Sequence, residues 1–406
     1  MIYTLAPRKR LSKTGLPFLL LTLQLLSGCA LAVKDTDSTH SAAIVIDTHS
    51  DFIDRSAADG SALNEDPDAA QTSLHKLEQG EVDAQFFSVF VPPAHKDYGF
   101  ARRAYEQIDQ IHEQVHINAP RIEMAYSAQD IENAASKGVV AALIGVEGGH
   151  AIENRLAHLR NFYRLGVRYM TLTWANTNEW ADASGDEAKW SGLNEQGVAV
   201  VKEMNRLGMM VDVSHVSDDT FWDVLDVSQA PVIASHSLAR GVMDHPRNMN
   251  DKMIKALAAN DGVVQVSFYS QYISERFHRE FKKAYERALP RRQALDEKYA
   301  NDPVQNDLAQ WALQKQIEFE LIPPSLDDLV AHFEHIIDLV GVDHVGLGSD
   351  FDGMGAPPAG LEHIGLIQNL TDALIAKGHS TEDMKKILGG NLLRVMRANE
   401  ELARKQ

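Results

Sequence analysis

Short apolar runs alternate along this chain with longer segments in which apolar positions recur every three or four residues. The short runs are apolar on both faces, which is typical of strands buried in a parallel sheet. The longer segments, such as residues 100–115 and 194–208, have the period of an amphipathic helix. We expect strands at residues 43–47, 83–91, 141–146, 169–173, 209–214, 231–235, 262–268 and 344–349.

Eight strand-and-helix units in one stretch of this length favour a (β/α)8 barrel of the TIM type. We therefore expect residues 43–406 to form a single barrel domain. An open, doubly wound parallel sheet is the alternative, because it has the same alternation of elements.

One region interrupts the alternation between the seventh and eighth expected strands. Residues 271–322 are rich in charged residues and have helical periodicity, with no strand pattern. We interpret this region as a helical insertion near the carboxyl-terminal face of the barrel. The regular pattern resumes at PPSLDDLV, where Ser325 is the expected N-cap of a helix and Asp328 its third residue.

Composition limits the class of protein. The 406 residues are 44% hydrophobic, enough for one large core, and the formal net charge is −18. This acidic balance argues against a nucleic-acid partner. The chain has one cysteine, Cys29, so no disulfide can form within it.

The N-terminus has the pattern of an export signal. Four basic residues precede the apolar residues 16–26, a run too short to span a bilayer comfortably. The following LSGC resembles a bacterial lipoprotein lipobox, which implies a signal peptide at residues 1–28 and a lipid on Cys29. An ordinary secretory signal is the alternative. Removal of residues 1–28 takes away four basic and no acidic groups, leaving a charge of −22. Residues 29–42 would be a flexible tether, and Ala30 favours the outer membrane, facing the periplasm.

Ionisable residues follow five of the expected strands. In a barrel the carboxyl ends of the strands meet at one mouth, so these side chains should converge. Singly, each has an ordinary explanation, since a histidine after a strand is more often a packed or solvated loop residue. Together, buried carboxylates without compensation would be costly, and divalent cations remove that cost. The residues are His49 and Asp51, Glu147, His215, His236 and Asp350.

Imidazole and carboxylate ligands suit zinc, and less well manganese or cobalt. Five ligands are too many for one open catalytic zinc ion but suit two ions that share a carboxylate. We expect His49 and Asp51 to hold one ion, His215 and His236 the other, and Glu147 to bridge them.

Six ordered motifs give the chain a family resemblance. DTHSD, GVEGGH, YMTLTxxNT with WADAS, VDVSHVS, ASHS with HPRN, and GSDFDG resemble the membrane (renal) dipeptidase family of zinc dipeptidases. The resemblance implies a (β/α)8 hydrolase that cleaves dipeptides, some with a carboxyl-terminal D-residue, by attack of a hydroxide bridging two zinc ions. It assigns the metal ligands to His49, Asp51, Glu147, His215 and His236.

The resemblance also assigns substrate contacts. Arg247, in HPRN, matches the residue that grips the terminal carboxylate of the substrate, although a surface loop arginine is the ordinary alternative. Asp350 matches an acidic residue that contacts substrate and shuttles a proton. Glu147 and Asp350 are therefore the expected catalytic residues.

One position departs from the family pattern. After YMTLT the family usually has a histidine that binds substrate, whereas this chain has Trp174. An indole N–H can donate a hydrogen bond but cannot act as a cation or base. Asn176 and Asn178 are the candidates to replace the histidine, and His150 is a candidate for supporting the ligands from behind. The departure affects the expected substrate more than the reaction.

Two other functions fit the sequence less well. A related metal-dependent amidohydrolase would act on β-lactam-like or N-acyl amino acid amides. A non-catalytic metal- or peptide-binding lipoprotein is disfavoured because all five ligand positions and Asp350 are present. The family also implies a possible homodimer.

Overall fold

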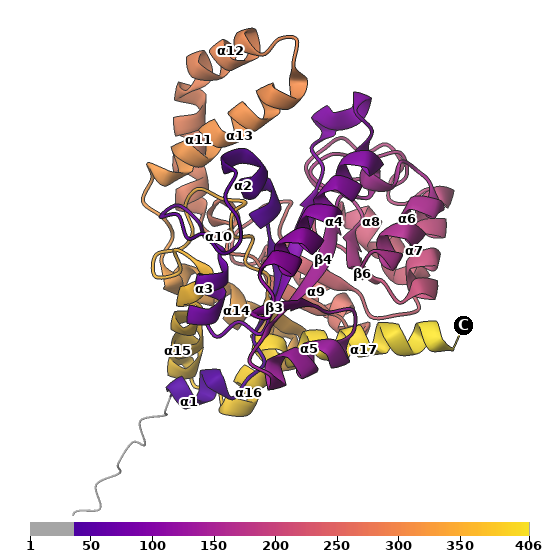
Figure 1. Ribbon diagram of the computed structural model, residues 1–406, viewed down its shortest axis with the longest axis vertical. Helices are drawn as coiled ribbons and strands as arrows, with labels where there is room; N and C mark the ends of the chain where they lie inside the picture. The colour runs from indigo at the N-terminus through magenta and orange to yellow at the C-terminus, as the bar shows by residue number, and fades with distance from the viewer. Residues whose placement is uncertain (1–35, 406) are drawn as a thin grey trace, which may run out of the picture. The chain divides into compact units, whose positions relative to one another are not determined.

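The computed structural model describes residues 36–405, and in it strands and helices alternate around a parallel barrel (Figure 1). Eight strands follow one another in the order β1-β2-β4-β5-β6-β7-β8-β9, all parallel. The strands of the described chain are β1 (Ile46–Ser50), β2 (Ala84–Phe90), β3 (Ile122–Met124), β4 (Val140–Glu147), β5 (Val167–Thr171), β6 (Met210–Asp212), β7 (Ile233–Ser237), β8 (Val263–Val266) and β9 (Val345–Leu347).

The first and last strands meet just beyond their carboxyl ends. Ser50 pairs with Phe351, and the backbone N–H of Asp51 donates to Phe351 O at 2.8 Å. The sheet is therefore a barrel, and the alternative of an open, doubly wound sheet is wrong. β3 was not expected from the sequence and lies off the barrel path, where it pairs only with the start of β4.

Helices connect the strands. The α-helices of the described chain are α1 (Thr36–Ser41), α2 (Phe52–Asp59), α3 (Leu74–Gln79), α4 (Phe100–Ile117), α5 (Ala128–Ser136), α6 (Leu156–Arg164), α7 (Glu195–Leu207), α8 (Asp218–Val227), α9 (Asp251–Ala259), α10 (Ser270–Ile273), α11 (Glu275–Arg287), α12 (Leu289–Lys298), α13 (Pro303–Phe319), α14 (Leu326–Val340), α15 (Gln368–Lys377), α16 (Thr381–Lys385) and α17 (Asn391–Arg404). Short 3-10 helices are η1 (Pro93–Asp97), η2 (Gly149–Ile152), η3 (Val342–His344) and η4 (Ile364–Leu366), and η5 (Lys386–Gly390) is a π-helix.

Strand residues alternate between two hydrophobic clusters, as the period of a strand requires. In β4, Ala141 and Leu143 pack with alternate residues of the other strands and with α17, whereas Ala142 and Ile144 pack with the surrounding helices. The first set fills the barrel interior. Glu147 continues the interior series at the carboxyl end of β4, so the strand itself aims this carboxylate into the mouth.

The insertion between β8 and β9 is helical, as expected, and comprises α10 to α13. Figure 1 shows α11, α12 and α13, in orange, lying side by side. Phe277, Phe281, Leu313 and Ile317 form a separate hydrophobic cluster that also includes Ala356 from the loop after β9. The next helix, α14, begins with the expected capping box of Ser325 and Asp328.

The expected tether is wrong over its last residues. Residues 36–41 form α1, and His40 is buried, with Nδ1 2.8 Å from Thr371 Oγ1 and Nε2 3.1 Å from Gly80 O. These contacts make the segment part of the barrel. The expected signal peptide, Cys29 and residues 29–35 lie outside the described residues. Among residues 36–405, no helix is long and apolar enough to cross a membrane.

Candidate metal centre and active site

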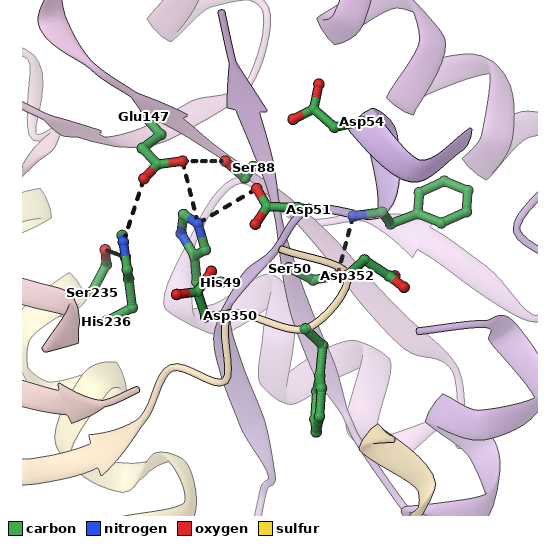
Figure 2. Close-up of polar contacts among 12 residues, drawn as sticks. His49, Ser50, Asp51, Asp54, Ser88, Glu147, Ser235, His236, Asp350 and Asp352 are labelled. Carbon is green, nitrogen blue, oxygen red and sulfur yellow. Dashed lines mark hydrogen bonds and ion pairs between the residues drawn. The ribbon is translucent and has the colours of Figure 1, made fainter. Parts of the chain in front are cut away.

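The five expected ligands come together at the mouth of the barrel. Figure 2 shows His49, Asp51, Glu147 and His236 of this set. His49 Nε2 lies 3.7 Å from Asp51 Oδ1 and 3.5 Å from Glu147 Oε2. His215 Nε2 and His236 Nε2 are 2.9 Å apart. His49 and His236 also stack, with ring centroids 3.8 Å apart.

Glu147 stands between two sets of ligands. Its Oε1 lies 2.8 Å from His215 Nε2 and 3.4 Å from His236 Nε2, whereas its Oε2 faces His49. Ser88 Oγ, on β2, approaches Oε2 at 3.5 Å. Each carboxylate oxygen therefore serves a different side of the site, which is the arrangement a bridging ligand needs.

A tyrosine that the sequence analysis missed fixes the orientation of His49. The Tyr169 hydroxyl donates to Thr48 O at 2.9 Å and lies 2.9 Å from His49 Nδ1. Because the hydroxyl hydrogen points to Thr48, His49 Nδ1 must be the donor to Tyr169, which leaves His49 Nε2 to face the site. Gly145 makes room for the ring, since a Cβ there would lie 1.9 Å from Tyr169 Cζ.

A second relay orients His236 in the same way. Ser235 Oγ donates to Asp212 Oδ2 at 2.6 Å and lies 2.8 Å from His236 Nδ1. His236 Nδ1 is therefore the donor to Ser235, and its Nε2 lone pair faces Glu147. The backbone N–H groups of Ser214 and Ser235 also donate to Asp212. Asp212 was also missed, because an acid in VDVS resembles any polar strand residue.

The electrostatics of the site favour bound cations. Burial raises the pKa of Asp51 to about 7, with a further contribution from the charge of Glu147. Burial and then the charge of Asp51 raise the pKa of Asp350 well above its usual range. Burial lowers the pKa of His49, but the carboxylates of Glu147, Asp51 and Asp350 together outweigh burial and raise this pKa to about 10. The clustered carboxylates thus need more positive charge than the neighbouring side chains supply.

The other two histidines are held neutral, the form that binds metals. Burial and the nearby Arg247 guanidinium lower the pKa of His215 to about 4. Burial, followed by the charge of His49, lowers the pKa of His236 well below its usual range.

Backbone conformation marks the same positions. His215 and Asp350 have φ of 67° and 68°, in the left-handed region that non-glycine residues rarely occupy. Such strain is retained where a side chain must be aimed at a functional site.

The residues fit a metal ion. His49 Nε2 and Asp51 Oδ1 are buried and make no hydrogen bond within residues 36–405. Ligand atoms of His49, Glu147 and His236 lie within 4.8 Å of one another, and so do those of His49, Asp51 and Asp350. Two overlapping ligand sets therefore exist, both containing His49. Asp350, expected to contact substrate, belongs to the second set.

Arg247 lies beside the ligands and is buried, so it is not a surface loop arginine. Its Nη1 donates to Ser237 Oγ at 3.0 Å and its Nη2 to His236 O at 2.8 Å. Its Nε has no partner among the described residues. The guanidinium carbon lies 6.0 Å from the centroid of the Tyr272 ring.

Trp174 stands at the edge of the site. Its ring is half-buried, with centroid distances of 4.7 Å to Phe90 and 6.4 Å to His215. Of the two candidate replacements for the family histidine, Asn178 is wrong, because its amide is occupied by Leu172 O, Trp180 N and Ala181 N.

Asn176 keeps a buried Oδ1 without a hydrogen-bond partner in the described chain. His150 bonds Val91 O at 2.7 Å and packs edge-on against Phe100. It therefore holds the turn after Glu147 and does not hydrogen bond to a ligand.

Comparison with known proteins agrees with this geometry. Residues 34–406 match the model of the family described as Membrane dipeptidase (Peptidase family M19). The chain belongs to the membrane dipeptidase family. The resemblance found in the six motifs is thus confirmed.

Relatives of this family member include proteins from fungi and mammals. Dipeptidase tcpJ of Claviceps purpurea (strain 20.1) is 36% identical over 347 residues, which are 83% of this chain and 71% of tcpJ. Dipeptidase 3 of Mus musculus is 35% identical over 340 residues, 82% of this chain and 59% of the mouse protein.

Solved structures share the fold. The probable dipeptidase PvdM from Pseudomonas aeruginosa is 25% identical, with a TM-score of 0.76 over 91% of this chain and 98% of PvdM. A metallo peptidase from Rhodobacter sphaeroides, solved with a phosphinate mimic of the dipeptide L-Ala-D-Ala, is 23% identical, with a TM-score of 0.71 over 88% of this chain and 99% of that chain. At that identity the second likeness shows the fold alone.

Proposed function

We propose that this protein is a zinc-dependent dipeptidase with two metal ions bridged by Glu147. Membership of the membrane dipeptidase family supports the reaction class. The observation that carries the two-ion proposal is the placement of Glu147, whose Oε1 faces His215 and His236 while its Oε2 faces His49. His49 and Asp51 would hold one ion and His215 and His236 the other.

Bound zinc would lower the pKa of a water molecule to near neutrality and polarise the scissile carbonyl. The protein supplies the remaining functions. Asp350 has a raised pKa and lies at the ligand cluster, so it can hold a proton near neutral pH and give it to the leaving amine. Arg247 has an unpaired Nε and can bind the terminal carboxylate of a dipeptide.

The aromatic side chains at the edge suggest where the first residue of the substrate lies. Trp174 and Phe90 form an apolar wall next to His215. A wall of this kind favours apolar first residues. Because Trp174 stands where the family usually has histidine, an amidohydrolase acting on β-lactam-like or N-acyl amino acid amides is the second candidate function.

The experiment is metal analysis combined with turnover. We expect about two zinc ions per chain, loss of activity on chelation, recovery with zinc, and cleavage of dipeptides with a free carboxylate in preference to N-acylated amino acids. Glu147→Gln should lose most of the bound metal and the activity, because the bridging carboxylate serves both ions.

Ser88→Ala is a matched control, since Ser88 contacts Glu147 only at 3.5 Å. Full activity of a verified metal-free preparation would contradict the proposal. Turnover of N-acyl amino acids alone would favour the amidohydrolase.

We also propose lipid attachment at Cys29 in the cell envelope, facing the periplasm, and assembly into a homodimer. The lipobox pattern LSGC supports the anchor. Family resemblance alone supports the dimer, and sedimentation or light scattering of the purified protein tests it.

A further inference from the structure

The inserted helix α13 places a buried carboxylate behind the active site. Glu318 is 2% exposed although it belongs to the charged insertion. Its Oε1 accepts hydrogen bonds from Tyr269 Oη at 2.9 Å, Gln271 Nε2 at 2.6 Å and Gln314 Nε2 at 3.2 Å. Its Oε2 accepts from the backbone N–H of Gly355 at 2.7 Å. Because both oxygens of this buried carboxylate accept hydrogen bonds, the network fixes one arrangement of Glu318 and its partners.

The partners of Glu318 belong to two different loops of the mouth. Tyr269 and Gln271 follow β8, whereas Gly355 follows β9, five residues after Asp350. Ser270 Oγ donates to Ala356 O, which joins the same two loops directly. Glu318 therefore connects the loop of Asp350 to the loop after β8.

The backbone of α13 rests directly on the loop after β9. A Cβ at Gly355 would lie 2.0 Å from Lys315 O, so only glycine allows this approach. Lys315 Nζ also donates to Asp352 O at 3.3 Å. Asp352 has a φ of 67°, and its carboxylate accepts from the N–H groups of Gln71 and Thr72.

The loop after β8 also contacts Arg247 and its neighbour in the sequence. The rings of Tyr269 and Tyr272 stack, with centroids 4.9 Å apart, and Arg247 lies over Tyr272. Asn248, the residue after Arg247, donates from Nδ2 to Tyr272 O at 2.9 Å. A shift of Tyr269 would thus be passed to the arginine through packed rings and a hydrogen bond.

From these contacts we propose that α13 is a positioning element of the active site and that Glu318 is its positioning residue. Glu318 fixes Asp350 through Gly355 and fixes Arg247 through Tyr269 and Tyr272. The insertion thereby sets the distance between the proton-carrying group and the carboxylate clamp. This inference rests on the roles proposed above for Asp350 and Arg247.

The test compares Glu318→Ala with Glu320→Ala, a control at the exposed C-cap residue of the same helix, whose carboxylate accepts a side-chain hydrogen bond from Gln316. Both proteins are assayed at full metal loading, well below their melting temperatures. Misplacement of a catalytic group by about 1 Å can cost about 100-fold, so Glu318→Ala should raise KM, lower kcat and reduce kcat/KM by up to about 100-fold. The control should match the wild type.

Two further variants separate the two connections. Glu318→Gln keeps a neutral acceptor for only one of the two loops. Its kcat/KM should therefore lie between the values of Glu318→Ala and the wild type. Tyr269→Phe removes the hydroxyl that bonds Glu318 but keeps the ring, so it should raise KM by a few-fold, roughly the effect of one lost hydrogen bond, with little change in kcat.

Amide hydrogen exchange gives a readout that does not depend on turnover. Residues 352–356 and 269–272 should exchange faster in Glu318→Ala than in Glu320→Ala. Wild-type KM and kcat in metal-loaded Glu318→Ala, or a lower melting temperature as its only change, would overturn the inference. Where that variant fails to fold, an unchanged KM in Tyr269→Phe would overturn it. A wild-type protein that cleaves no dipeptide contradicts the proposed function, and the exchange rates still decide the role of α13.

Discussion

Two histidines of the candidate centre owe their tautomers to neighbours on the barrel strands. The Tyr169 hydroxyl and the Ser235 hydroxyl each donate elsewhere, to Thr48 O and to Asp212, and so each must accept from a histidine Nδ1. Both Nε2 atoms are thereby held on the side of Glu147. Removal of a residue that hydrogen bonds to a metal ligand typically weakens metal binding by about 10- to 100-fold.

Tyr169→Phe should therefore weaken zinc binding by about 10- to 100-fold without removing a ligand, because His49 loses the acceptor that fixes its tautomer. Competition with a chromophoric chelator measures the affinity. Tyr105→Phe is the matched control, since its hydroxyl contacts His158 on the outer helices. Equal zinc affinity in both variants would show that Tyr169 does not orient His49.

Arg247→Ala should mainly raise KM, because a substrate carboxylate keeps its charge in the ground and transition states alike. A charge-assisted contact is worth about 2–4 kcal/mol when truncated, or about 30- to 1000-fold in kcat/KM. Arg240→Ala controls for lost charge. Arg240 lies on the same loop as Arg247, between β7 and α9, but pairs with Asp218 of α8. An unchanged KM on every dipeptide cleaved would rule out the carboxylate clamp.

At the scale of elements, the sequence predicted what depends on local pattern. Buried parallel strands are apolar on both faces, so all eight barrel strands were found, and Ser325 and Asp328 revealed the start of α14. β3 was missed because it has only three residues, one buried and two partly exposed, which carry too little pattern. The helix α1 was missed because TDSTHS is polar and is held by distant residues, among them Thr371.

The candidate site divides in the same way. The convergence of the candidate ligands could be predicted because they follow strands, and strand ends converge in a barrel. The sequence did not predict the supporting roles of Tyr169, Asp212 and Glu318. Each resembles an ordinary strand or helix residue, and only the fold brings its partners near. Glu318 meets Gly355 from 37 residues away and Tyr269 from 49 residues away.

The helix α14 carries a histidine that should make stability depend on pH. His332 is fully buried, accepts from Ala239 N–H through Nδ1 and therefore donates from Nε2 to Ile273 O. Burial lowers its pKa to about 4. The unfolded chain binds the proton near pH 6.5, so stability should be lost as pH falls from about 6.5 to about 4, by up to about 3 kcal/mol.

Denaturant unfolding at several pH values measures this loss. His332→Gln keeps an acceptor and a donor but cannot be protonated, so its stability should vary less over the same range. Parallel pH curves for the two proteins would contradict the assignment.

At the scale of the whole molecule, we expect the barrel to fold and act without the proposed anchor. Cys29→Ala should leave the enzyme folded and active but release it from the membrane fraction, because the proposed attachment is a covalent lipid. Fractionation after a high-salt wash, with activity assayed in each fraction, measures this. Retention of the variant in washed membranes would contradict the lipobox interpretation.

The barrel closes where its chemistry lies. Asp350 N–H donates to His49 O at 3.0 Å, and Ser349 Oγ donates to Asp47 Oδ2 at 2.7 Å, across about 300 residues of sequence. During synthesis, the five ligand residues His49, Asp51, Glu147, His215 and His236 emerge long before β9, the strand that joins the two ends of the sheet. A nascent chain therefore carries these proposed ligands without the seam that positions them, and the proposed hydrolytic activity can arise only after β9 has been synthesised.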